Sequence, residues 1–369
     1  MEHFLLSDSL KSLIILSKSG LTNDDMAYLK KNEENESKLF ALAERHRITP
    51  LVWSNLQKTD LFSTACREQF QLAARQNQIN AIHAKSIQGK LQLIQTELGV
   101  NGYFLKGIGI AERFYHDIGE RHVLDLDWFV GPEGVEMVSD KLISMGYVAS
   151  PNITQFNHAQ WKYFKSTHHD IYFSAPSSIS NLPIELHWKL RSPWSGFILN
   201  PEVNMNGMDE FLYLCVHGTE HGWFRLKWLL DLPRIIDKRK FDWDELWSRA
   251  RELNCIQQLS ISLLVLEALS LMPLPGILRD RISTNQFRSQ LLYINRVINA
   301  NDSFNENDGN RWRYFNYLMG LRNSKWDLSF MKLVLTSPAD WQLLKLPSSV
   351  FPLYFLLRPF LWIYRRVGI

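Results

Sequence analysis

Three acidic side chains in two short apolar segments have the type and spacing that metal-assisted chemistry requires. Asp125 and Asp127 lie two residues apart in HVLDLDWFV, residues 122–130, and Glu185 lies in LPIELHWKL, residues 182–190. The valine, leucine, tryptophan and phenylalanine around them favour packed strands, so the carboxylates must face solvent or meet positive charge. Because side chains alternate along a strand, we expect Asp125 and Asp127 on one face, roughly 7 Å apart.

A divalent cation would relieve the repulsion between such carboxylates. Hard oxygen ligands suit Mg²⁺, which proteins commonly hold with one or two carboxylates plus substrate phosphates. Glu185 supplies a third acid, and His187 shares its face because the two residues are two apart on a predicted strand. Three carboxylates on neighbouring strands form the layout of a two-metal phosphoryl-transfer site. The alternative interpretation is an exposed strand face with solvated acids and no metal.

A glycine-bearing turn precedes the acidic strand, in FLKGIG, residues 104–109. The pattern predicts a strand, a turn and a helix, so backbone N–H groups at the start of the helix could meet a phosphate. Lys106 adds a positive charge to the turn at Gly107, and Arg121 lies four residues before Asp125. These residues are therefore candidates for the phosphate side of the site.

Two further pairs have helical spacing. His217 and His221 lie four apart in LCVHGTEHGW, residues 214–223, so they share one face of a predicted helix. With Glu220 they have the His-x-x-Glu-His order of some zinc peptidases, but a packed or substrate-facing pair is the preferred interpretation. Lys227 lies four residues before Asp231, which predicts a helical ion pair, with a nucleotide contact as the alternative.

The elements that must position these residues change in kind along the chain. Apolar residues three and four apart predict helices in residues 1–98 and again in 201–340. Residues 99–200 alternate between short strands and helices, and the strands are expected to include YFL (103–105) and WKYFKS (161–166). The polar segment 299–310 predicts a loop. We therefore expect an α+β fold, a small mixed-sheet core flanked by N-terminal and C-terminal helical regions.

Composition narrows the class of protein. The chain has 369 residues, of which 46% are hydrophobic and 21% charged, as in a globular protein of two or three domains. A net charge of +3 does not favour an extended nucleic-acid surface. The three scattered cysteines form no metal spacing and no disulfide framework, and the start of the chain lacks the pattern of a signal peptide. A cytoplasmic location is the expectation.

The last residues, 341–369, are expected to form a basic amphipathic tail. They contain Lys345, Arg358, Arg365 and Arg366, no acid, and many aromatic residues. Such a segment favours peripheral contact with the anionic inner face of a membrane, and packing on the protein is an equally favoured alternative. The apolar run 350–364 contains two prolines and is shorter than the ~20 residues that cross a bilayer, so a transmembrane helix is not expected.

The motifs taken together resemble a known family. LKGIGIAERFY, the Arg-x-x-x-Asp-x-Asp element, IELHW and the later LKWLLDL are similar to the uncharacterised nucleotidyltransferase family. That family is often encoded in bacterial surface-polysaccharide loci and belongs to the DNA polymerase β-like nucleotidyltransferase superfamily. The resemblance covers about residues 40 to 240 of the chain. The sequence departs from the superfamily in having Ile108 where glycine or serine usually follows the first glycine, and a glutamate as third acid.

The resemblance implies a reaction and roles for the candidate residues. A nucleoside monophosphate would pass from a nucleoside triphosphate to an acceptor, plausibly in surface-glycan metabolism, with Mg²⁺ or Mn²⁺ as cofactor. The implied metal-binding and catalytic residues are Asp125, Asp127 and Glu185. The expected nucleotide-binding residues are Lys106, Gly107, Arg121, His187, His217, His221 and Lys227. Two alternatives are an enzyme of toxin–antitoxin type that nucleotidylates protein or RNA, and a non-catalytic binding module of a glycan assembly system.

Overall fold

The structure of the chain is a computed structural model that describes residues 4–33, 36–176, 182–191, 196–199, 205–300, 308–321, 332 and 334–367. The chain divides into two compact units, each formed from three separate segments. We call Met1–Leu91, Phe104–Leu124 and Met205–Arg322 the helical unit, and Gln92–Tyr103, Asp125–Asn204 and Asn323–Ile369 the sheet unit. The four regions expected from the sequence therefore contribute to two units, and the helices before and after the predicted core share one of them.

The helical unit is built from amphipathic helices with capped starts. Ser7 caps the first helix, and Thr22 and Asp25 form a reciprocal capping box at the second. Leu13, Phe70 and Phe211 are fully buried in its core. In chain order, its elements are α1 (Asp8–Leu16), α2 (Asn23–Lys31), α3 (Glu36–His46), α4 (Thr49–Leu56), the start of α5 (Thr64–Leu98), α6 (Ile108–Phe114), η2 (Ile118–Glu120), α9 (Gly207–Glu220), α10 (Leu226–Arg239), α11 (Trp243–Glu252), α12 (Ile256–Ala268), η4 (Gly276–Leu278), η5 (Thr284–Phe287), α13 (Arg288–Asn299) and α14 (Asp308–Gly320).

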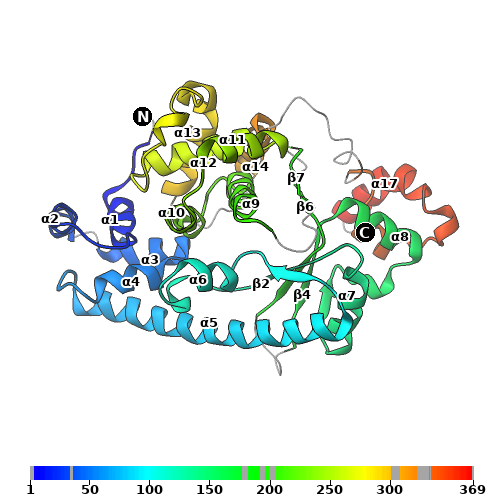
Figure 1. Cartoon of the computed structure of the whole chain (residues 1–369). Helices are drawn as coiled ribbons and strands as arrows, with labels where there is room; N and C mark the ends of the chain where they lie inside the picture. Colours follow the sequence, from blue (N-terminus) through cyan, green and yellow to red (C-terminus); the bar gives the residue numbers. More distant parts are fainter. Residues whose placement is uncertain are drawn as a thin grey trace. The chain divides into compact units, whose positions relative to one another are not determined.

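The sheet unit contains a five-stranded mixed sheet in the order β1-β2-β5-β4-β3. Figure 1 labels β2 and β4 of this sheet. Strands β2 and β5 run parallel, whereas β4 is antiparallel to both β5 and β3. Its elements are β1 (Gly102–Phe104), β2 (Leu126–Val130), α7 (Val135–Ser144), β3 (Val148–Ser150), η3 (Ile153–Gln155), α8 (His158–Thr167), β4 (Asp170–Ser174), β5 (Ile184–His187), β6 (Leu190–Arg191), β7 (Ile198–Leu199), α16 (Pro338–Leu343), η6 (Ser348–Val350) and α17 (Leu353–Val367). The expected α+β class, with a mixed sheet and flanking helices, is confirmed.

The central strands of the sheet are largely buried. All five residues of β2 are buried, as are Ile184 and Leu186 of β5 and Phe173 of β4. Continuous burial is typical of a central strand whose two faces are both covered. An ionisable side chain on such a strand is expensive to bury unless it has a partner, so Asp127 in β2 requires one.

Two expectations about strands in this unit are wrong. Residues 161–166 belong to the helix α8, because Asn157 and Gln160 form a capping box at its start and the apolar Phe164 is buried four residues after Gln160. The acidic strand is also shorter than expected, since β2 begins at Leu126. The backbone N–H of Val123 donates to the side chain of Asn77 rather than to a neighbouring strand.

The C-terminal segment packs on the sheet unit through its first residues. Trp341, Phe351 and Tyr354 are buried, and the ring of Trp341 lies 5.0 Å from that of Phe156. Tyr354 also accepts a hydrogen bond of 3.2 Å from Gln160 in α8. The packing alternative therefore holds for the start of this segment.

Three further expectations concern a loop, a membrane-spanning helix and the cysteines. The loop expected at 299–310 lies largely outside them, between the end of α13 and the start of α14. No helix in the described ranges is long and apolar enough to cross a membrane. The cysteines, Cys66, Cys215 and Cys255, are buried free thiols, and burial raises the pKa of Cys66 to about 11 and of Cys215 to about 12.

Candidate metal and nucleotide site

The sheet brings Asp127, Glu185 and His187 together. In the parallel pairing of β2 with β5, Asp127 lies opposite Glu185, so their side chains emerge on the same face. His187 follows Glu185 by two residues and shares that face, with its Nε2 3.3 Å from Asp127 Oδ1 and 3.7 Å from Glu185 Oε2. One ligand atom from each residue lies within 4.8 Å of the others. These three residues thus form a compact group of two carboxylates and an imidazole.

His187 lies among acidic side chains. Burial disfavours its charged form, but hydrogen bonds to Asp127 and Glu185 and the nearby charge of Asp170 outweigh that cost and raise its pKa to about 9. Asp170 lies opposite His187 in the pairing of β4 with β5. A protonated His187 therefore balances the buried carboxylate of Asp127 in the protein alone.

The group has the donor atoms of a divalent cation site. Carboxylate oxygens suit Mg²⁺ and Mn²⁺, and a neutral imidazole is a common ligand for transition metals. The distances among the three side chains fit one ion, with Asp127, Glu185 and His187 as its ligands. Within the described ranges, no other group of three histidine, cysteine or acidic side chains has this proximity.

The structure places Asp125 differently from Asp127. Asp125 directly precedes β2, is half-buried, and is not a member of the three-residue group. His187 was expected to contact nucleotide, but its position beside both acids makes it a candidate ligand as well. Its two-residue spacing from Glu185 was the sequence signal for this position, whereas the pairing register that brings Asp127 opposite Glu185 required the fold.

The glycine turn and Arg121 lie together in the helical unit. Gly107 has φ 58° and ψ −125°, a conformation that only glycine adopts readily, and α6 begins at the next residue. Arg121 donates from Nη1 to the Gly107 carbonyl at 3.1 Å. Its other nitrogens form an ion pair with both oxygens of Asp231, at 2.9 and 2.8 Å. Arg121 therefore holds the turn in place, and Tyr115 adds a 2.7 Å hydrogen bond to Asp231.

This arrangement differs from the ion pair expected between Lys227 and Asp231. The carboxylate of Asp231 is bound by Arg121, with both side chains 2% exposed. Lys227 is also buried, in the first turn of α10. The spacing of Lys227 from Asp231 gave no sign of Arg121, which approaches the acid from a distant part of the sequence.

His217 and His221 form an aromatic cluster with two residues that sequence reasoning missed. The two histidine rings lie 4.6 Å apart, and the Trp228 ring lies 5.2 and 5.4 Å from them. Phe224 packs edge-on against Trp228 at 5.0 Å. These four side chains come from the end of α9 and the start of α10, and none of them is fully buried. The zinc alternative at His217, Glu220 and His221 finds no three-ligand group there in the described part of the chain.

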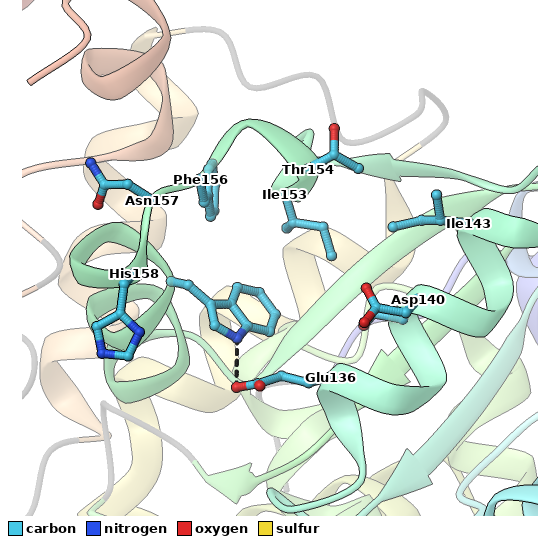
Figure 2. Close-up of a pocket in the computed structure, with 10 residues that line it drawn as sticks. Glu136, Asp140, Ile143, Ile153, Thr154, Phe156, Asn157 and His158 are labelled. Carbon is cyan, nitrogen blue, oxygen red and sulfur yellow. Dashed lines mark hydrogen bonds between the residues drawn. The ribbon is translucent and has the colours of Figure 1, made fainter. Parts of the chain in front are cut away.

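A separate hollow of about 230 Å³ lies in the sheet unit between α7 and α8 (Figure 2). Glu136 lies at one side, where it accepts a 2.7 Å hydrogen bond from the indole of Trp161, drawn as a dashed line. Hydrogen bonds from Lys165 and Trp161 lower the pKa of Glu136. The lining residues are Glu136, Ser139, Asp140, Ile143, Ile153, Thr154, Phe156, Asn157, His158 and Trp161. This hollow contains none of the candidate metal ligands.

Asp127 on β2 lies opposite Glu185 on the parallel strand β5, and His187 lies beside both. The fold and this group of side chains define a class of protein, an α+β domain suited to holding a divalent cation. The chain belongs to the uncharacterised nucleotidyltransferase family, whose model matches residues 32–270, well over half of its length. This membership supports nucleotidyl transfer as the general activity. No curated protein and no solved structure matches the chain.

Proposed function

We propose that the protein is a metal-dependent nucleotidyltransferase that moves a nucleoside monophosphate from a nucleoside triphosphate to an acceptor. The observation that carries the proposal is the register of β2 and β5, which sets Asp127 opposite Glu185 in a chain of this family. An acceptor oxygen would form a bond to the α-phosphorus as the bond to pyrophosphate breaks. The proton of the acceptor hydroxyl would pass to a protein carboxylate.

The two acids have different surroundings, which suggests different roles. The Asp127 side chain is 4% exposed and bonded to His187, so it is fixed in place. The Glu185 side chain is 30% exposed and can meet an incoming acceptor, so Glu185 is the candidate general base. Asp127, Glu185 and His187 would hold Mg²⁺ or Mn²⁺, which when bound neutralises phosphate charge. Asp125 remains a proposed additional ligand at the start of β2.

The nucleotide contacts are proposed in the helical unit. Lys106 and Gly107 form a turn whose conformation Arg121 fixes, and backbone N–H groups there can bind phosphate. The cluster of His217, His221 and Trp228 offers partly exposed rings of the kind on which nucleobases stack. Arg121 acts mainly as a positioning residue in this scheme, because its guanidinium nitrogens are already bonded to the Gly107 carbonyl and to Asp231.

The acceptor is proposed to be a sugar or a glycan-pathway intermediate, with the reaction placed at the cytoplasmic side of a membrane. The exposed part of α17 supports the proposed location at a membrane. Leu356 and Phe360 are 72% and 70% exposed, and Ile363 and Val367 continue the same stripe of the helix. The guanidinium of Arg366 lies 4.1 Å from the Trp362 ring centre, at the basic end of this stripe. Such a surface can dip into a headgroup layer.

Transfer of label from a nucleotide tests the activity directly. The purified chain is incubated with each α-³²P-labelled nucleoside triphosphate, Mg²⁺ or Mn²⁺, and fractions of a bacterial extract, and the products are separated from free nucleotide. We expect metal-dependent labelling of a small molecule or lipid-linked glycan. Labelling of protein or RNA would instead favour the toxin–antitoxin alternative.

The Asp127→Asn variant decides whether the proposed metal site is used. Nucleotide with Mg²⁺ should raise the melting temperature of the wild type more than nucleotide with chelator, because a bound ligand stabilises the folded state. Asp127→Asn should abolish that difference, while Asp140→Asn, at an exposed position on α7, should retain it. An unchanged metal-dependent shift in Asp127→Asn would exclude the site, provided that circular dichroism shows a native fold.

A further inference from the structure

The hollow between α7 and α8 has an acidic wall and an apolar wall. Glu136 and Asp140 lie one helical turn apart on α7, and their carboxylates point from that helix toward α8 (Figure 2). Ile143, Ile153 and Phe156 supply apolar surface. The volume of about 230 Å³ is larger than the ~150 Å³ of an engineered cavity that binds benzene, so one small molecule can be accommodated.

The charge of the hollow is negative. Its described lining residues include two acids and no lysine or arginine. Asp140 makes no hydrogen bond and no ion pair with the described residues, so its carboxylate has no counter-ion from that part of the chain. The other polar residues of the lining are Ser139, Thr154, Asn157 and His158. A positively charged ligand is therefore favoured over a negatively charged one.

The surroundings of Glu136 show how this wall binds an ammonium group. Lys165 donates a hydrogen bond to Oε1 of Glu136, and its ammonium nitrogen lies 5.6 Å from the ring centre of Trp161. The indole N–H of Trp161 donates to the same oxygen at 2.7 Å. An ammonium is attracted both to a carboxylate and to an aromatic face, and Lys165 uses both. The second oxygen, Oε2, accepts no hydrogen bond from the described residues, so Glu136 retains an acceptor for a ligand.

A buried hydroxyl in the same wall lacks a partner. Ser139 lies on α7 three residues after Glu136 and directly before Asp140, so these side chains share one face of the helix. It lines the hollow, is only 1% exposed, and its Oγ makes no hydrogen bond to the described residues. A buried polar atom without a hydrogen bond is costly. A ligand that donates a hydrogen bond to this oxygen would remove that cost.

Other classes of ligand match the lining less well. A phosphate or carboxylate would meet two acids and no lysine or arginine among the described lining residues. A metal ion would have two carboxylates here, and the described part of the chain has its three-ligand group elsewhere, at Asp127, Glu185 and His187. A purely apolar molecule would leave Asp140 and the Ser139 hydroxyl without partners. An ammonium carries one positive charge and three N–H donors, which matches the acceptors that are present.

We propose that the hollow between α7 and α8 binds a small organic molecule through an ammonium group. The ammonium would donate hydrogen bonds to Asp140, to Oε2 of Glu136 and to Oγ of Ser139. The carbon skeleton of the ligand would lie against Ile153 and Phe156. Binding requires neither a metal nor a nucleotide, because the hollow contains none of the candidate metal ligands. The protein would thus bind a second class of ligand besides the nucleotide of its proposed function.

Saturation-transfer NMR with a matched pair of probes tests this site. The probes n-butylamine and 1-butanol have the same carbon chain, and only the amine is positively charged at pH 8. In EDTA, we expect the wild-type chain to bind the amine and to bind the alcohol much more weakly. Asp140→Asn should weaken amine binding about tenfold, because one charge-assisted contact is lost. Ser139→Ala should weaken it to a smaller extent, and Glu133→Gln, at an exposed acid outside the hollow, should leave it unchanged.

Three results would overturn the proposal. They are equal binding of n-butylamine and 1-butanol, no binding of the amine by the wild type, and wild-type affinity for the amine in Asp140→Asn with a native circular dichroism spectrum. The metal site is tested separately. Asp127→Asn should bind the amine like the wild type, and Asp140→Asn should keep the metal-dependent shift in melting temperature that nucleotide produces. Failure of either proposal would therefore be distinguishable from failure of the other.

Discussion

Asp127 and Glu185 face each other across paired strands, yet one is enclosed and the other is reachable. His187 bonds to both, so that each carboxylate has a partner without a metal. This explains how two acids are tolerated beside a core that includes Trp128 and Leu186. Substitution of either acid therefore removes a negative charge beside His187 as well as a candidate metal ligand.

We predict that Glu185→Gln will lower turnover far more than nucleotide affinity. The amide keeps the size of the side chain but cannot accept the acceptor's proton, so the change should appear in kcat rather than in nucleotide binding. Glu133→Gln, an exposed acid beyond the end of β2, provides the matched control. Turnover that stays within about tenfold, or ~1.4 kcal/mol of barrier, would show that Glu185 has no catalytic role.

The sequence was most informative about individual candidate residues. The Asp-x-Asp and Glu-x-His spacings identified Asp127, Glu185 and His187, because alternation along a strand depends only on local geometry. The place of Asp125 was harder to predict. Where β2 begins depends on the hydrogen bond from Leu126 to Pro183, far along the chain, and the two-residue period holds only inside the strand.

Among the elements, α8 shows where local patterns mislead. Its sequence WKYFKS is rich in aromatic residues and suits a strand by propensity, but the capping box formed by Asn157 and Gln160 starts a helix before it. The spacing of Gln160, Phe164 and Thr167, all buried, is that of one helical face. The residues that favour a helix, Asn157 and Gln160, lie just before the segment 161–166 for which a strand was predicted.

The last helix, α17, combines both alternatives for the C-terminal segment. Arg358 and Arg365 pair with the fully buried Asp340, so two of the four basic residues serve internal contacts. Deleting the segment after Asp340 would remove both arginine partners of this buried carboxylate, and breaking a buried ion pair typically costs about 3–5 kcal/mol. A test of membrane contact therefore needs point substitutions rather than a truncation.

We predict that the double variant Leu356→Gln/Phe360→Gln will lose binding to anionic vesicles in co-sedimentation. These side chains are exposed, so the fold should be unaffected, while the apolar area available to the headgroup layer falls. Leu72→Gln/Leu93→Gln, exposed to a similar degree on α5, is the control and should sediment like the wild type. Wild-type binding should weaken between 0.1 M and 1 M salt, as the screening length falls from about 10 to about 3 Å. Equal sedimentation of all three proteins would contradict the membrane proposal.

At the scale of the whole molecule, sequence reasoning could not pair segments that are distant in the chain. Arg121 and Asp231 come together only because helices that lie before and after the sheet in the chain share one core. Loop closure and packing decide such contacts, and no local period encodes them. The fold class was predictable because alternating and helical patterns are local; the pairing of Arg121 with Asp231 was not.

The buried histidines make a prediction for the pH dependence of stability. The folded pKa of His122 is about 3, well below its unfolded value of about 6.5, so the folded state binds fewer protons and stability falls as pH decreases below about 6.5. Between pH 7 and pH 5 this group should cost at most about 2 kcal/mol of unfolding free energy. His46, whose pKa is also lowered by burial, acts in the same direction, whereas the raised pKa of His187 acts weakly in the opposite one.

Urea unfolding at pH 7 and pH 5, in buffers free of phosphate and sulfate, measures this effect. His122→Gln should reduce the loss of stability between the two pH values, and His83→Gln, at an exposed position on α5, should leave it unchanged. A pH dependence in His122→Gln equal to that of the wild type would show that His122 is readily protonated in the folded protein.

The burial of all three cysteines has a practical consequence for labelling chemistry. Maleimides react with thiolates, and burial raises the pKa of Cys66, Cys215 and Cys255, so the native thiols should be inert near neutral pH. Cysteines introduced at exposed Asp140 in the sheet unit and exposed Arg251 in the helical unit would then be the two reactive sites in an otherwise unaltered chain. A donor and an acceptor dye at these positions would measure, by energy transfer, the distance between the two labelled residues with and without nucleotide.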